Sequence, residues 1–75
     1  MEHRDAVILK KVLSEIEIAQ QMMDHKSFAE FDMDEMLKRA VCMTVINIGE
    51  LVKNLSEAFQ KAYPAVPWKA IAGFI

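Results

Sequence analysis

The chain has 75 residues, of which 53% are hydrophobic and 27% are charged, and its formal net charge is −2. This length limits the chain to one small domain, residues 1–75, which buries only about 60% of the surface that the unfolded chain exposes. A domain of this size cannot bury all the apolar surface that this composition gives it. We therefore expect it to associate with another chain or with further parts of the same protein. The acidic balance excludes the basic footprint that general nucleic-acid binding needs.

The N-terminus and the single cysteine indicate the cellular compartment in which we expect the protein. Residues 1–5, Met-Glu-His-Arg-Asp, are charged, so we expect no signal peptide. No run of 18 apolar residues occurs, so we also expect no membrane span. Cys42 has no second cysteine to pair with, which is typical of a cytoplasmic protein. Its position in an apolar run favours inert packing over a reactive thiol.

Residues 3–24 have the pattern of an amphipathic helix. Apolar side chains recur at spacings of three and four: Leu9, Val12, Leu13, Ile16, Ala19 and Met23. Val7, Ile8 and Ile18 widen this apolar face, which indicates contacts on more than one side. Residues 24–33 form the connection, where Ser27 and Glu30 have capping-box spacing. We expect Phe28 and Phe31 to cover the end of the helix pair, and Asp32 to start the next helix.

A second, longer helix is predicted over residues 33–63, with Pro64 ending it. Its middle, residues 40–52, is apolar nearly all round, so we expect other helices to cover it on several sides. Gly49 lies inside this segment and costs about 1 kcal/mol relative to alanine. Either another helix backbone approaches closely there, or the glycine is simply tolerated.

Pro64 and Pro67 bracket a tight corner that leads into a third helix. Pro67 suits the first position of that helix because its φ is fixed and it needs no hydrogen-bond donor. Trp68 and Ile71 are then expected to point back onto the long helix. No strand-like alternation occurs, so the predicted fold is all-α: an antiparallel helical hairpin with the start of a third helix.

Polar residues form a narrow stripe on the long helix, and Asn47, Glu50 and Asn54 are the candidate cleft or interface positions. Asn47 and Glu50 are surrounded in sequence by apolar residues. Three interpretations remain open for them: an exposed edge without a role, hydrogen bonding across a helix interface, or the lining of an active site. 

No other site is indicated. His3 and His25 lie far apart, and no further ligand stands at metal spacing, so we expect no metal and no cofactor. No glycine-rich phosphate loop and no nucleophile–base signature occur, and we therefore predict no catalytic residue in these 75 positions.

Several motifs in this order resemble one known family. They are Arg4-Asp5, Arg39-Ala40-Val41, residues 46–56 (Ile-Asn-Ile-Gly-Glu-Leu-Val-Lys-Asn-Leu-Ser), Tyr63-Pro64 and residues 67–73 (Pro-Trp-Lys-Ala-Ile-Ala-Gly). Together they resemble the HepT-like toxins of the HEPN superfamily. The resemblance implies a small, dimeric, all-α bundle that acts as the ribonuclease toxin of a toxin–antitoxin pair, with a minimal nucleotidyltransferase as the antitoxin.

The resemblance also implies a catalytic Arg, usually followed by Asn, with a His a few residues later, just after the Ile-Ala-Gly segment. Here Phe74 fits the apolar position after Gly73, and Ile75 stands where the Arg is expected. We therefore expect a shortened HepT-like ribonuclease domain that is inactive as given and acts on RNA only in its full-length relatives. The alternative is a non-enzymatic helical module for dimerisation or antitoxin binding.

Overall fold

The computed structural model describes residues 2–73, and this part of the chain consists of helices joined by short loops, without strands. Its five helices are α1 (His3–Met23), α2 (Phe28–Met33), α3 (Glu35–Lys53), α4 (Glu57–Ala62) and α5 (Trp68–Ala72). The all-α prediction is confirmed. The expectations placed on Phe74 and Ile75 lie outside the described residues.

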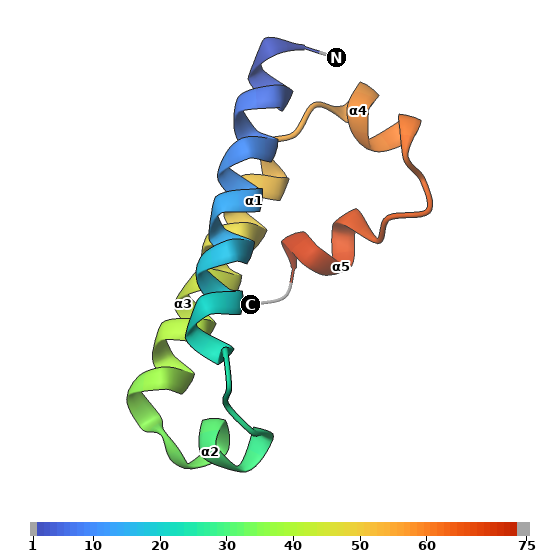
Figure 1. Cartoon of the computed structure of the whole chain (residues 1–75). Helices are drawn as coiled ribbons and strands as arrows, with labels where there is room; N and C mark the ends of the chain where they lie inside the picture. The colour runs from blue at the N-terminus through green and yellow to red at the C-terminus, as the bar shows by residue number, and fades with distance from the viewer. Residues whose placement is uncertain (1, 74–75) are drawn as a thin grey trace.

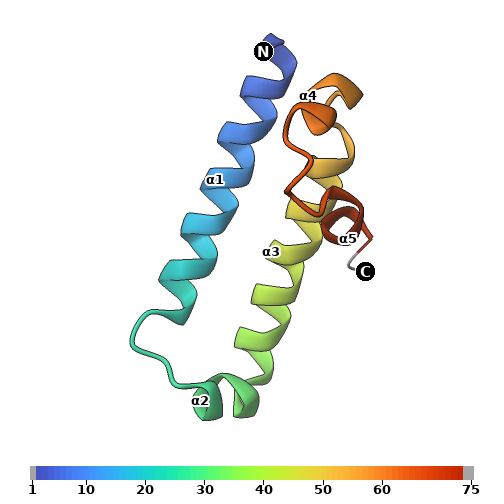
Figure 2. The same ribbon diagram turned by 90° about the vertical axis from the view of Figure 1, so that its right-hand side faces the viewer.

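The two long helices, α1 and α3, run side by side in opposite directions, and the short α2 closes one end of the pair (Figures 1 and 2). Ser27 and Glu30 form the predicted capping box, in which Ser27 Oγ accepts from the Glu30 amide at 3.1 Å and Glu30 Oε1 accepts from the Ser27 amide at 3.2 Å. α4 and α5 fold back from the other end along one side of the pair.

The prediction of one continuous helix over residues 33–63 is wrong, because the segment divides into α3 and α4. Asn54 ends α3, and its side-chain amide donates to the carbonyl of Glu50 at 3.0 Å. Ser56 then caps α4 by accepting from the Phe59 amide at 3.1 Å. Between them Leu55 turns into the core and is only 4% exposed. The helix breaks because capping and the burial of Leu55 together outweigh continuation of the helical ladder.

Three smaller expectations also need correction. α3 is capped by Asp34 rather than Asp32, and Asp34 Oδ1 accepts from the Leu37 amide at 3.0 Å. Pro67 precedes α5 as its capping residue rather than occupying its first position. Phe28 is 77% exposed and packs against Phe31 rather than over the end of the helix pair, whereas Phe31 is half-buried. The direction of a phenylalanine side chain in a short connecting helix depends on how that helix is oriented. The spacing of residues in the sequence does not determine that orientation.

α5 crosses α3 at Gly49, and this close approach is the first of the two explanations for the glycine. A β-carbon built at Gly49 would lie 3.1 Å from the carbonyl oxygen of Ile71. Trp68 and Ile71 pack onto the core from α5, as expected. A side chain at position 49 would therefore push α5 away from the hairpin.

The hydrophobic core is small and lies between the first half of α1, the second half of α3 and the returning α4–α5 segment. Its buried members are Ile8, Val52 and Leu55, and partly buried side chains surround them: Leu9, Val12, Ile48, Leu51, Phe59, Trp68, Ile71 and Ala72. Cys42 is exposed, which corrects the expectation that it packs inside. Within residues 2–73, no helix is long and apolar enough to cross a membrane.

Candidate functional site

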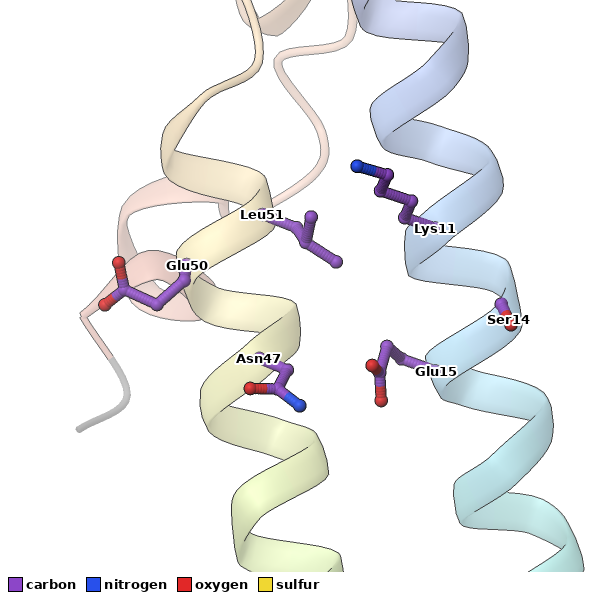
Figure 3. Close-up of a pocket in the computed structure, with 6 residues that line it drawn as sticks. All are labelled: Lys11, Ser14, Glu15, Asn47, Glu50 and Leu51. Carbon is purple, nitrogen blue, oxygen red and sulfur yellow. The ribbon is translucent and has the colours of Figure 1, made fainter.

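A shallow groove of about 360 Å³ lies between α1 and α3, and two of the three candidate polar residues line it. Lys11, Ser14 and Glu15 come from α1, and Asn47, Glu50 and Leu51 come from α3. In Figure 3, Asn47 and Leu51 point across the groove towards α1, and Lys11 and Glu15 point towards α3. The Glu50 carboxylate points away from α1.

Asn47 and Glu50 both line this groove, with their side chains pointing in different directions, whereas Asn54 lies elsewhere. Glu50 forms an exposed ion pair with Lys53, with 3.1 Å between Oε1 and Nζ. Asn54 lies at the end of α3, outside the lining of this groove, where its own carbonyl accepts a hydrogen bond from the Arg4 guanidinium. Asn47 and Glu50 are therefore on a solvent-accessible surface, and Asn54 belongs to the break between α3 and α4.

Sequence reasoning missed the α1 side of the groove. Lys11 and Ser14 lie off the main apolar face of α1, and Glu15 does not match the apolar pattern that predicted the helix. Their presence in the groove depends on how α1 and α3 are rotated about their axes. The apolar periodicity of each helix indicates which face is buried but does not fix the edges of the contact.

The groove offers charged and hydrogen-bonding groups but no nucleophile–base pair. Lys11 and Glu15 supply opposite charges from one helix, and Asn47 adds an amide from the other. Such a surface can bind polar groups of a partner through hydrogen bonds. His3 begins α1 and His25 follows its end at Met23, so the length of the helix, about 30 Å at 1.5 Å per residue, separates them. In the described part of the chain, no three His, Cys, Asp or Glu residues gather where they could hold a metal ion.

Among residues 2–73 the most deeply buried polar side chain is that of Asp5, which is 1% exposed and to which the sequence analysis assigned no structural role. Its two carboxylate oxygens accept from Ser56, one from the hydroxyl at 2.6 Å and the other from the amide at 2.8 Å. These bonds, the hydroxyl one above all, hold the pKa of Asp5 below its ordinary value of 3.8, and the burial of the group opposes them. Asp5 is thus an ionised residue whose hydrogen bonds join α1 to the start of α4.

The fold and the groove define a small all-helical domain with a polar surface between two long antiparallel helices. The model of the family described as "Ribonuclease HepT-like" matches residues 12–74. This match covers most of the 75 residues, so the chain belongs to the HepT-like ribonuclease family, as the motifs indicated.

Curated relatives agree with this membership. "Putative RNase TTE0752" of Caldanaerobacter subterraneus subsp. tengcongensis is 40% identical over 65 residues, which are 87% of this chain and 58% of that protein. "Putative RNase MJ0127" of Methanocaldococcus jannaschii is 48% identical over 46 residues, 61% of this chain and 38% of that protein. "Probable ribonuclease HepT" of Thermococcus cleftensis is 29% identical over 70 residues, 93% of this chain and 62% of that protein.

The chain therefore spans between 38% and 62% of the length of these three relatives. No solved structure matches it significantly.

Proposed function

We propose that this chain is the HepT-like ribonuclease component of a cytoplasmic toxin–antitoxin system. The observation that carries the proposal is the family match over residues 12–74, together with relatives whose names describe ribonucleases. The helical fold and the packing of Trp68 and Ile71 on the core are consistent with it, since these two residues belong to one of the motifs that resemble the family.

We further propose that these 75 residues do not cleave RNA by themselves. Metal-independent cleavage needs a group that moves the proton of the 2′-hydroxyl and a cation that stabilises the charge on the phosphate. In the family that the chain resembles, an Arg and a His after the Ile-Ala-Gly segment supply these groups. Here Phe74 and Ile75 follow Gly73, and neither His3 nor His25 stands a few residues after an arginine.

The test compares two purified proteins on labelled single-stranded RNA in the presence of EDTA. One is the 75-residue chain, and the other is the same chain extended with the Arg-to-His segment that the family resemblance implies. We expect cleavage only by the longer protein. Specific cleavage by the 75-residue chain, abolished by Glu50→Gln or His3→Ala, would place the chemistry on the described surface and contradict the proposal.

The proposed partners are a second copy of the chain and a minimal nucleotidyltransferase antitoxin. The observation that supports association is the set of large apolar side chains left exposed along α1: Val7, Leu13, Ile16 and Ile18. The same observation supports the alternative function, a non-enzymatic module for dimerisation or antitoxin binding. In either case Asn47 and Glu50 are proposed as polar positions at a cleft or interface.

Two measurements separate these possibilities. Sedimentation equilibrium at micromolar concentration is expected to give a dimer, and a folded monomer would remove the second copy from the proposal. Co-expression with a minimal nucleotidyltransferase of the antitoxin type is expected to give a complex. If the longer protein dimerises and binds the antitoxin but leaves RNA intact, the non-enzymatic alternative replaces the ribonuclease.

A further inference from the structure

The segment from α4 to α5, residues 57–73, forms a unit that we call the arm. Extensive contacts between helices join α1 to α3, α2 to α3 and α3 to α5, whereas α4 has no contacts of that extent within residues 2–73. In Figures 1 and 2 the arm leaves the end of α3, runs away from the hairpin and returns to it at α5. The position of the arm therefore depends on how its two ends are attached and on the packing of Phe59 and Trp68 against the core.

Bonds within the arm make it one body. The indole Nε1–H of Trp68 donates to two backbone carbonyls of the α4 region, Gln60 at 3.1 Å and Tyr63 at 3.0 Å. The ring of Phe59 packs against those of Trp68 and Tyr63, with centroid distances of 5.9 and 5.0 Å. Trp68 thus ties α5 to α4, and a movement of α4 is transmitted to α5.

The far end of the arm rests on α3 through apolar contacts and a close backbone approach. Ile71 and Ala72 pack against the core, and the carbonyl oxygen of Ile71 lies over Gly49. Among the hydrogen bonds of residues 2–73, none joins α5 to α3 and so fixes the angle between them.

The near end is fixed by directional bonds from the first turn of α1. Asp5 accepts both Ser56 donors, and the Arg4 guanidinium donates to the carbonyl of Asn54. The same Ser56 oxygen that donates to Asp5 accepts from the Phe59 amide and so caps α4. These bonds join residues about 50 positions apart, and they fix both the end of α3 and the start of α4.

We propose that Arg4 and Asp5 form a latch on which the docking of the whole arm depends. A six-residue helix such as α4 does not persist alone in water, so its order must come from its attachments. Loss of the bonds from Arg4 and Asp5 leaves Ser56 without its partner on α1, so that α4 can move. Because Trp68 bonds α5 to α4, α5 moves with it. The arm then opens as a local unit while α1 and α3 remain paired. This inference goes beyond the proposed function and holds whether or not the protein cleaves RNA.

The single tryptophan of the chain makes the latch measurable, because Trp68 lies in the arm. We would compare acrylamide quenching of Trp68 fluorescence in the wild type, Asp5→Ala and Arg4→Gln, with far-UV circular dichroism to follow the long helices. Asp34→Ala is the matched control, since it removes a carboxylate that caps a helix at the opposite end of the hairpin. 

We expect the quenching constant to rise about twofold in Asp5→Ala, and less in Arg4→Gln, because a locally opened segment exposes its side chains to the quencher. Most of the helical signal should remain. Asp5→Asn, which keeps one acceptor oxygen, should fall between the wild type and Asp5→Ala. Asp34→Ala should leave Trp68 as protected as in the wild type.

Two results would overturn the latch. Unchanged quenching in a folded Asp5→Ala protein would mean that the apolar contacts at Gly49 hold the arm without it. Loss of the helical signal in Asp5→Ala, Asp5→Asn and Arg4→Gln alike would mean that the arm and the hairpin unfold as one unit and that no separate latch exists.

Discussion

The two ends of the helical hairpin are held together in different ways. At the end where α1 begins, the buried side chains Ile8, Val52 and Leu55 meet, and Arg4 and Asp5 bond to residues about 50 positions away. At the α2 end, the side-chain hydrogen bonds span three to six residues, as in the Ser27 capping box and the Asp34 cap. The large apolar side chains Phe28, Met33 and Met36 are exposed there.

This difference shows that stability is distributed unevenly along the molecule. The arm end gains from burial and from bonds between distant segments, which form only when the chain folds as a whole. The α2 end depends on caps and short helices, whose individual contributions are small and local. Substitutions in the core at the first end should therefore affect the whole domain, and those at Arg4 and Asp5 the arm, whereas substitutions at the other end should affect only the helix concerned.

The largest expected effect is that of Leu55→Ala. Leu55 is buried in the core, and its truncation should lower the free energy of unfolding by about 3 kcal/mol through lost burial and a residual cavity. Met36→Ala, at the exposed α2 end, should change it by less than about 0.5 kcal/mol. Urea unfolding at one fixed protein concentration measures the free energy of unfolding of both variants. A loss at Met36 as large as that at Leu55 would show that the exposed face is covered in solution and would break the comparison.

A valine at Gly49 tests the contact between α3 and α5. Its side chain must enter the space below the carbonyl oxygen of Ile71, where even a β-carbon would lie at 3.1 Å. We expect a loss of about 2 kcal/mol, which is typical of overpacking in a closely packed site. The matched control is Met43→Val, which places the same residue on an exposed position of α3. Equal unfolding free energies for the two variants would mean that α5 does not rest on Gly49.

At the α2 end, Asp34→Ala removes the cap of α3 and should cost about 1 kcal/mol. Asp34→Asn keeps a capping oxygen and should restore most of that loss. Hydrogen exchange should increase in the first turn of α3, around Leu37, and remain unchanged at the arm end. Faster exchange spreading to Phe59 or Ile71 would contradict the separation of the two ends.

The sequence predicted most of the elements that depend on local patterns. The periodicity of α1, the capping box at Ser27 and the return of Trp68 onto the hairpin were all foreseen, because each follows from residues a few positions apart. The break after Asn54 was not foreseen, because it depends on a residue far away in sequence. Ser56 caps α4, and Asp5 in α1 accepts the hydrogen bond from the Ser56 hydroxyl.

In the candidate site, too, features set by nearby residues were predicted and features set by the packing of distant segments were not. The helical spacing of Asn47 and Glu50 placed both on one edge of α3, and both do line the groove. Lys11 and Glu15, which complete the groove, come from the other helix, and only the packing of α1 on α3 brings them there. Asn54 shares the same stripe by spacing, but the end of α3 takes it out of the groove.

The smallest expected effect concerns pH, and it is specific to the arm end. The bonds from Ser56 lower the pKa of Asp5, so its contribution to stability is fully present above the ordinary value of 3.8 and is lost as the pH falls through the lower value in the folded protein. The effect is modest because the burial of Asp5 opposes the hydrogen bonds. From neutral pH down to that ordinary value, Asp5 should therefore contribute no pH dependence.

Urea midpoints of the wild type and of Asp5→Asn, measured from neutral pH to about pH 2, check this expectation. The difference between the two proteins should be constant at first and then shrink below the ordinary pKa of Asp5, because the protonated carboxyl can no longer accept both bonds from Ser56. Glu17→Gln, which removes an exposed carboxylate of α1, provides the background. A difference that stays constant over the whole range would show that Asp5 stabilises the arm end through its shape, not through its charge.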